Sequence, residues 1–247
     1  MSRFYVSKEK INTKKNEILI EGEEFHHAID VMRLKDSDKV IIFDGTGNEY
    51  TGFINKIDPK SKKAAVEVVK IETPSSGKTS EVVLAQAIPK KGKMDYIVEK
   101  ATELGVKRIV PLVTGRTIVR PDEGGGEKKV SRWRKLAIES AKQSGRADIP
   151  AVSEVTPFKK AIEEIERYDL ALFACLSGKT VSLKKAVGDF KSGKIIVFVG
   201  PEGDFTPEEI SLASGKNCRH VSLGWRVLKS DTAGLFLISV LDYEFNI

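Results

Sequence analysis

The sequence predicts an α/β protein whose C-terminal part contains a mostly parallel sheet, preceded by a small β-barrel. Three observations carry this prediction. The first 72 residues alternate apolar and polar side chains in short bursts, which is typical of small strands. From residue 82 onward, apolar strand-like runs alternate with helical patterns. Near the C-terminus, an apolar run at residues 195–199 leads into a glycine turn and a capped helix, an order typical of ligand sites in open α/β sheets.

The chain is long and apolar enough to bury a core. Its 247 residues, 40% of them hydrophobic, fit one large or two modest domains. The net charge of +6 agrees with a polyanionic partner, although a surplus of this size is also common on enzymes in general. We expect a cytoplasmic protein, because the longest apolar run, residues 233–241, is far shorter than a membrane span and the N-terminus lacks a secretory signal pattern. Cys175 and Cys218 lie in apolar runs without metal-ligand spacing, which predicts buried free thiols.

The N-terminal elements are predicted from period-two alternation. Strands are expected at residues 4–6, 18–20, 40–43, 50–57 and 64–71. Residues 24–34 are the one helical insert, since their apolar side chains recur on one helical face. Residues 73–80 are rich in Thr, Pro, Ser and Gly and break all periodicity, so they are predicted to be a linker. The predicted domains are therefore residues 1–72 and 81–247.

The C-terminal elements alternate between strand and helix. Strands are expected at residues 82–88, 108–113, 170–176, 195–199 and 218–222. Helices are expected at residues 94–104, from residues 131 and 157, near residue 183, after residue 206 and at residues 233–241. Residues 121–129, which contain three consecutive glycines, are predicted to be a mobile loop.

Two glycine turns in this part indicate a ligand site. The first, residues 200–203, directly follows the apolar strand at residues 195–199. Thr206 and Glu209 then match a capping box, with Pro207 at the first helical position. The second turn, residues 223–226, follows the next short strand and leads through Lys229 into the last helix. Because ligands collect beyond the carboxyl ends of strands in open α/β sheets, the paired turns predict a binding site.

These turns resemble the signature of RsmE-type small-subunit ribosomal RNA uridine-N3 methyltransferases, members of the SPOUT superfamily. The shared residues are GPEG with its capped helix and LG-x-R-V-L-K-x-D-T-A. The resemblance extends to the ELGV of residues 103–106, the pair Gln143 and Arg146, and the pair His27 and Arg33. It implies a PUA-like RNA-binding domain, a deep trefoil knot, a homodimer, S-adenosylmethionine as cofactor, and methylation of uridine N3 in small-subunit (16S) ribosomal RNA.

The chain departs from the usual pattern of this family at four positions. Asp204 stands where glycine is usual, and Trp225 stands where proline is usual. Lys229 replaces arginine and Asp231 replaces glutamate, so both keep the charge while changing the geometry of the side chain. The sequence provides no explanation for Asp204 or Trp225.

The chemistry implied by the resemblance assigns roles to site residues. Uracil N3 is a poor nucleophile until its proton leaves, so cationic donors at the uracil oxygens would favour the reaction. The predicted catalytic residues are Arg226 and Lys229, which stabilise the anion, and Asp231, which, like Glu202, is a candidate for the proton acceptor. The predicted cofactor-binding residues are Leu176, Ser177, Gly200, Pro201, Glu202, Gly203, Leu223, Gly224, Val227 and Leu228. The predicted RNA-binding residues are Arg3, His27, Arg33, Lys90, Lys91, Lys93 and Arg146. The reaction needs no metal, and no metal site is predicted.

Other functions stay open at this point. A non-catalytic RNA-binding protein would explain the basic charge but not the paired glycine turns, and a methyltransferase could act on a different RNA. A nucleotide triphosphatase is disfavoured, because the Gly-Lys-Thr sequences at residues 77–79 and 178–180 lack the glycine that a phosphate-binding loop requires five residues earlier, where Glu72 and Phe173 stand. His27 is equally compatible with a surface imidazole and with an RNA contact. The lysine groups at residues 60–63, 90–93 and 128–129 are by default solvated faces, although basic clusters are also what binding to RNA phosphates requires.

Overall fold

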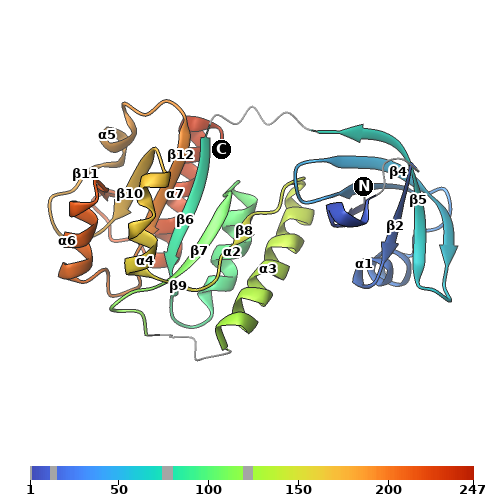
Figure 1. Ribbon diagram of the computed structural model, residues 1–247, viewed down its shortest axis with the longest axis horizontal. Coiled ribbons are helices and arrows are strands. Elements are labelled where there is room, and N and C mark those ends of the chain that lie inside the picture. The colour runs from blue at the N-terminus through green and yellow to red at the C-terminus, as the bar shows by residue number, and fades with distance from the viewer. Residues whose placement is uncertain (1, 12–15, 74–79, 119–124) are drawn as a thin grey trace. The chain divides into compact units, whose positions relative to one another are not determined.

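The computed structural model describes residues 2–11, 16–73, 80–118 and 125–247 (Figure 1). The chain forms two compact units, Met1–Ser76 with Ile138–Ile149, and Gly77–Ala137 with Pro150–Ile247. Most of the predicted linker, residues 74–79, lies outside the described residues, and Ser80 already belongs to a strand. The first unit also includes a segment that the predicted boundaries place in the C-terminal domain. One reason is an ion pair within this unit, in which the Lys142 Nζ lies 2.9 Å from a Glu24 carboxylate oxygen.

The first unit contains a five-stranded sheet, as the alternating pattern predicted. Its strands are β1 (Ser2–Tyr5), β2 (Glu17–Glu21), β3 (Lys39–Phe43), β4 (Glu49–Asp58) and β5 (Lys63–Glu72), in the order β1-β3-β4-β5-β2. The pair β1–β3 is parallel and the other neighbours are antiparallel. The predicted helical insert is present as α1 (Glu23–Phe25) and the π-helical turn η3 (His26–Val31). A short 3-10 turn, η1 (Lys8–Lys10), was not predicted.

The second unit contains an eight-stranded sheet in which every described pairing is parallel, which confirms the predicted mostly parallel sheet. Its strands are β6 (Ser80–Ala87), β7 (Arg108–Val113), β8 (Ala151–Val152), β9 (Thr156–Pro157), β10 (Leu170–Ala174), β11 (Val181–Ser182), β12 (Gly193–Val199) and β13 (Arg219–Ser222). The order is β11-β13-β10-β12-β6-β7-β8, and β9 pairs with β7. The central strands read as continuous apolar runs because helices cover both faces of the sheet.

The helices of this unit are α2 (Lys93–Glu103), α3 (Gly125–Ser144, which continues into the first unit), α4 (Phe158–Glu163), η4 (Ile165–Arg167), α5 (Leu183–Val187), α6 (Pro207–Gly215) and α7 (Ser230–Phe245). Alternate residues of β6 face opposite layers. Val83 and Ala85 belong to a core cluster with residues of α4 and α6, whereas Leu84 lies against Gly234 of α7. Helix α7 also packs against α2. No helix of the described residues is long and apolar enough to span a membrane.

Two helix starts test the capping predictions. Helix α6 begins as predicted, since the Thr206 hydroxyl accepts a hydrogen bond from the Glu209 amide and the Glu209 carboxylate accepts one from the Thr206 amide. The start of α3 differs, because the helix begins at Gly125 and not at residue 131. The prediction of a loop was therefore wrong for residues 125–129, where three charged helix formers outweigh the two glycines. Residues 121–124 lie outside the described residues.

Strand register brings the site together. Ala174 at the end of β10 lies opposite Val199 of β12 on one side and Val221 of β13 on the other. The three strands are parallel, so their carboxyl ends lie at the same edge of the sheet. The loops that follow residues 174, 199 and 222 therefore leave the sheet next to one another.

Candidate active site

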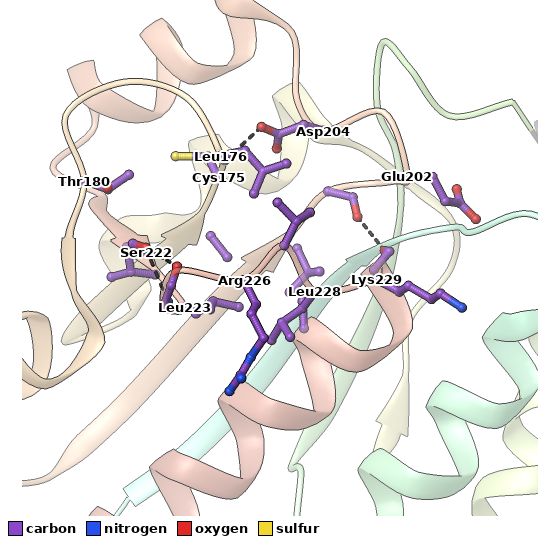
Figure 2. A pocket seen from close by; sticks show the side chains of 18 of the residues that line it. Cys175, Leu176, Thr180, Glu202, Asp204, Ser222, Leu223, Arg226, Leu228 and Lys229 are labelled. Atoms are coloured by element: carbon purple, nitrogen blue, oxygen red, sulfur yellow. Dashed lines mark hydrogen bonds between the residues drawn. The ribbon is translucent and has the colours of Figure 1, made fainter.

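A pocket of about 460 Å³ lies at this edge of the sheet (Figure 2). Its walls are residues 174–176 and 180 after β10, residues 199–202 and 204 after β12, and residues 221–230 and 233 at the end of β13 and the start of α7. The pocket thus unites the two glycine turns that the sequence singles out. It also includes the loop after β10.

The structure places most of the predicted cofactor-binding residues in the lining of this pocket. The lining members are Leu176, Gly200, Pro201, Glu202, Leu223, Gly224, Val227 and Leu228. Ser177 and Gly203 are not among the lining residues. The Ser177 carbonyl accepts a hydrogen bond from the Cys175 thiol at 3.3 Å, and the Gly203 carbonyl accepts one from Arg116 Nη1 at 2.6 Å. These two residues therefore shape the turns from outside the pocket.

A buried hydrogen-bond chain supports the first glycine turn, and sequence reasoning missed it. The Gln86 amide donates to the Ser230 hydroxyl at 2.9 Å, and this hydroxyl donates to the Gly200 carbonyl at 2.6 Å. These two hydrogen bonds connect the end of β6, the start of α7 and the end of β12. A side chain at Gly200 would come within 3.2 Å of the Phe205 ring, so only glycine fits this turn closely. Gln86, a polar residue inside an apolar strand, is the sequence signal that could have indicated these hydrogen bonds.

Asp204 adopts a conformation that favours glycine. Its φ angle is 61°, in the left-handed region, where an aspartate is tolerated better than most side chains. The Asp204 carboxylate lines the pocket and accepts a hydrogen bond from the Leu176 backbone N–H at 2.9 Å. Glycine would therefore fit this position without strain, while in this chain the aspartate side chain adds a connection between two pocket walls.

The predicted catalytic residues are separated by the structure. Arg226 and Lys229 both line the pocket, and Figure 2 shows their side chains extending away from one another. The Arg226 guanidinium lies 4.6 Å from the centre of the Trp225 ring. This cation–π contact gives a role to the tryptophan, which the sequence left unexplained. Asp231 is not among the lining residues, and its carboxylate accepts a hydrogen bond from Lys93 Nζ at 3.2 Å.

A thiol and an imidazole meet at the pocket wall, which the sequence did not indicate. The Cys175 sulfur lies 3.6 Å from His220 Nδ1, and His220 Nε2 lies 3.1 Å from the Ser214 hydroxyl. Burial, together with the Asp204 carboxylate, raises the pKa of the Cys175 thiol to about 11. Burial also lowers the pKa of His220. Both groups are therefore held neutral near pH 7, and the prediction of buried free thiols is confirmed for Cys175 and Cys218.

The predicted RNA-binding residues of the first unit differ in exposure. Arg3 donates to the Glu49 carboxylate at 2.7 Å and to the Arg146 carbonyl at 3.0 Å, and both arginine side chains are largely buried. The His27 Nδ1 is buried and has no hydrogen-bond partner among the described residues. Arg33 is exposed and adopts a left-handed φ of 57°. In the first unit, Arg33 is thus the most accessible of the predicted cations.

The predicted lysines of the second unit lie near the first glycine turn. The Lys90 backbone N–H donates to the Glu202 carboxylate at 3.0 Å, and the side chains of Lys90 and Lys91 are exposed. Lys93, by contrast, is engaged by Asp231. These two contacts hold the segment before α2 beside the pocket, with two exposed ammonium groups on it.

Comparisons with known proteins agree with this architecture. The RNA methyltransferase domain model matches residues 76–242, and the RNA methyltransferase PUA domain model matches residues 20–67. The chain is 29% identical to ribosomal RNA small subunit methyltransferase E of Bacillus subtilis, over 91% of this chain and 89% of that one. It is also 29% identical to the protein of the same name from Rickettsia conorii, over 96% of this chain and 93% of that one.

Solved structures show the same fold. A ribosomal RNA small subunit methyltransferase E from Neisseria gonorrhoeae, bound to S-adenosyl methionine, has a TM-score of 0.86 at 27% identity, over 99% of this chain and 98% of that one. A methyltransferase from Legionella pneumophila, in complex with the same cofactor, has a TM-score of 0.86 at 28% identity, over 98% and 96% of the two chains. These similarities confirm the resemblance found in the sequence. With its RNA methyltransferase domain preceded by a PUA domain, the chain belongs to the RNA methyltransferase family.

Proposed function

We propose that this protein transfers a methyl group from S-adenosylmethionine to N3 of a uridine in small-subunit ribosomal RNA. The observation that carries the proposal is the single pocket built from both glycine turns, at the ends of β10, β12 and β13. Relatives along almost the whole chain are named ribosomal RNA small subunit methyltransferase E, and the similar structure from Neisseria gonorrhoeae is bound to S-adenosyl methionine.

The residues present fit this cofactor. A volume of about 460 Å³ lies within the range of pockets for small organic ligands, roughly 300–1,000 Å³. Backbone groups of residues 200–202 and 223–228 would hold the polar edges of the adenosine. Leu176 and Val227 offer apolar surface, and Glu202 offers negative charge for a cationic ligand. When bound, S-adenosylmethionine supplies an electrophilic methyl group.

The side chains around the pocket serve the uracil. Loss of the N3 proton leaves negative charge on the uracil oxygens, and Arg226, which is among the residues that line the pocket, supplies the guanidinium that stabilises this charge. Lys229 contributes a second positive charge. Of the two candidate proton acceptors, Glu202 lines the pocket whereas Asp231 pairs with Lys93, so we assign the proton to Glu202.

Exposed cations are available for the RNA backbone. Lys90 and Lys91 lie beside the Glu202 wall of the pocket, where they can neutralise phosphates next to the reacting base. Arg33 would contribute from the first unit. Because the substrate is ribosomal RNA, we place the protein in the cytoplasm.

We also propose the deep trefoil knot that the resemblance implies. The order of the sheet supports it, because β13, the last strand of the chain, lies between β10 and β11 and pairs with both. The chain that follows β13 then starts α7, which packs on β6 and β12. The C-terminal segment thus lies among elements formed by earlier parts of the chain.

We expect a homodimer at micromolar concentration. Phe236 and Tyr243 of α7 are seven residues apart and therefore share a helix face, and Tyr243 is 86% exposed in the single chain. Trp225 and Val227 add exposed apolar surface beside the pocket. Light scattering should give the mass of two chains, and Tyr243→Glu should shift the mass toward one chain. A monomeric wild-type protein would contradict the proposal.

The role of Arg226 gives the most direct test of function. Arg226→Ala should lower turnover about a hundredfold to a thousandfold, because a donor that acts on developing charge is worth most in the transition state. Cofactor affinity, measured by calorimetry, should stay nearly unchanged. The substrate is small subunits from a strain that lacks the enzyme, and the readout is a reverse-transcriptase stop, since a methyl group on N3 blocks base pairing.

The controls separate the remaining alternatives. Arg226→Lys keeps a positive charge without the planar donor pair and should retain intermediate activity. A non-catalytic RNA-binding protein would show no heat of binding with S-adenosylmethionine. A stop at a base other than uridine, or in another RNA, would replace the substrate assignment, and full activity of Arg226→Ala would remove the arginine from the mechanism.

A further inference from the structure

We propose that Asp204 is a positioning residue for the cofactor, because its carboxylate holds the pocket wall at residues 175–177 in place against the first glycine turn. The inference rests on the proposed function, since S-adenosylmethionine is the ligand concerned. It assigns a task to a side chain that sequence reasoning found unexplained.

The hydrogen bond joins two separate walls of the pocket. The Leu176 N–H that donates to Asp204 at 2.9 Å follows the end of β10, and Asp204 follows the end of β12, 28 residues later in the chain. Leu176 is 65% exposed, so core packing, which holds the neighbouring Cys175, does little to fix Leu176 itself. The Cys175 thiol donates to the Ser177 carbonyl within the wall and lies 3.6 Å from His220 Nδ1 of β13, so neither of these contacts reaches the first glycine turn. Among the described residues, the hydrogen bond from Leu176 N–H to Asp204 is therefore the contact that ties this wall to the first glycine turn.

Asp204 itself is held rigidly. Its backbone N–H donates to the Pro201 carbonyl at 3.0 Å, and the next residue, Phe205, is 1% exposed and packs in the core cluster. Because Asp204 is already ordered by these contacts, its carboxylate can hold the Leu176 N–H in place at little further cost in conformational entropy. Figure 2 shows this carboxylate directed at the Leu176 and Cys175 end of the pocket.

The backbone of Asp204 makes the proposal sharply testable. At a φ of 61°, glycine is the residue with no steric cost, so Asp204→Gly relieves backbone strain while it removes the carboxylate. The unfolding temperature of Asp204→Gly should therefore be unchanged or raised. Affinity for S-adenosylmethionine should nevertheless fall about tenfold, the typical effect of losing a hydrogen bond to a charged acceptor. A purely structural role would instead lower stability and affinity together.

Asp204→Asn is the matched variant. Asparagine also tolerates the left-handed conformation and keeps a side-chain oxygen that accepts from Leu176 N–H, so its affinity should stay within about threefold of wild type. If Asp204→Asn loses as much affinity as Asp204→Gly, charge and not positioning is responsible, and the proposal fails. It also fails if Asp204→Gly binds as tightly as wild type, or if its unfolding temperature drops along with its affinity.

Thiol alkylation of the full chain supplies an independent readout with an internal control. Cys175 lines the pocket, while Cys218 is buried and is not among the lining residues. In wild type, S-adenosylmethionine should slow alkylation by iodoacetamide at Cys175 but not at Cys218. Without cofactor, Asp204→Gly should react faster than Asp204→Asn at Cys175 only, because both variants remove the negative charge that raises the pKa of this thiol but only Asp204→Gly releases the wall. Equal Cys175 rates in the two proteins would overturn the proposal.

The same measurements distinguish the two levels of inference. If wild type shows neither binding heat nor protection of Cys175, the cofactor assignment of the proposed function is wrong, and the positioning role is lost with it. If wild type binds and is protected while both Asp204 variants behave like wild type, the proposed function stands and only the role of Asp204 is refuted.

Discussion

His220 is the single residue whose protonation is most closely linked to the site. Its ring lies 5.1 Å from that of Phe173, and its two nitrogens approach the Cys175 sulfur and the Ser214 hydroxyl. Burial lowers its pKa below the ordinary value of 6.5. The neutral imidazole is thus the form that the folded protein accommodates.

This shift predicts a loss of stability in mild acid. As pH falls through about 6.5, the unfolded chain binds a proton that His220 in the folded protein binds only at lower pH. The contribution of His220 is fully present above pH 6.5, and it declines as pH falls below that value. Between pH 7.5 and pH 5.5, the free energy of unfolding, measured with urea, should decrease less for His220→Gln than for wild type. Equal decreases in the two proteins would contradict the prediction.

At the scale of elements, Ser230 joins three of them. Its hydroxyl accepts from Gln86 at the end of β6 and donates to Gly200 at the end of β12, while Ser230 itself starts α7. Both partners are buried, so neither can exchange its lost hydrogen bond for one to water. These hydrogen bonds thereby fix the first glycine turn relative to α7, whose first residues also line the pocket.

Ser230→Ala should destabilise the protein by about 1–3 kcal/mol, because it leaves a buried carbonyl and a buried amide group with one hydrogen bond fewer. Affinity for S-adenosylmethionine should fall as well, since the glycine turn loses its support. Ser239→Ala is the control, since the Ser239 hydroxyl is exposed and bonds only within α7, to the Leu235 carbonyl at 2.9 Å. Denaturant titration and calorimetry measure the two effects. A Ser230→Ala protein as stable as Ser239→Ala would refute the stabilising role of the Ser230 hydrogen bonds.

At the scale of the whole molecule, the division into units bears on cofactor binding. Every residue that lines the pocket belongs to the second unit, whereas Ile138–Ile149 packs with the first. In the full chain, Lys142 in this segment is 6% exposed and pairs with Glu24. Removing the first unit would return the Lys142 ammonium group to water, so it would not leave a buried unpaired charge.

The fragment of residues 77–247 should therefore bind S-adenosylmethionine within about threefold of the full chain, a difference of about 0.65 kcal/mol, because every residue that lines the pocket belongs to it. Its unfolding temperature should be lower, since residues 138–149 lose their packing partners. Circular dichroism and calorimetry on the fragment and the full chain provide the comparison. A fragment that is folded but shows no binding heat would mean that the first unit takes part in the cofactor site.

The sequence by itself determined the features that depend on neighbours along the chain. Apolar runs predicted the strands of the parallel sheet, and Thr206 with Glu209 predicted the start of α6, because capping and periodicity involve residues within a few positions of each other. The two glycine turns and most residues that line the pocket followed from the same local patterns and from the family resemblance.

Only the tertiary structure decided how distant side chains pair. Gln86 meets Ser230 across 144 positions, Lys93 meets Asp231 across 138, and Cys175 meets His220 across 45. These contacts depend on the strand order and on which helix covers which face, and neither is written in a local pattern. The same reason explains why Asp231, predicted to act on the substrate, pairs with a lysine, and why the unexplained Asp204 connects two walls of the pocket.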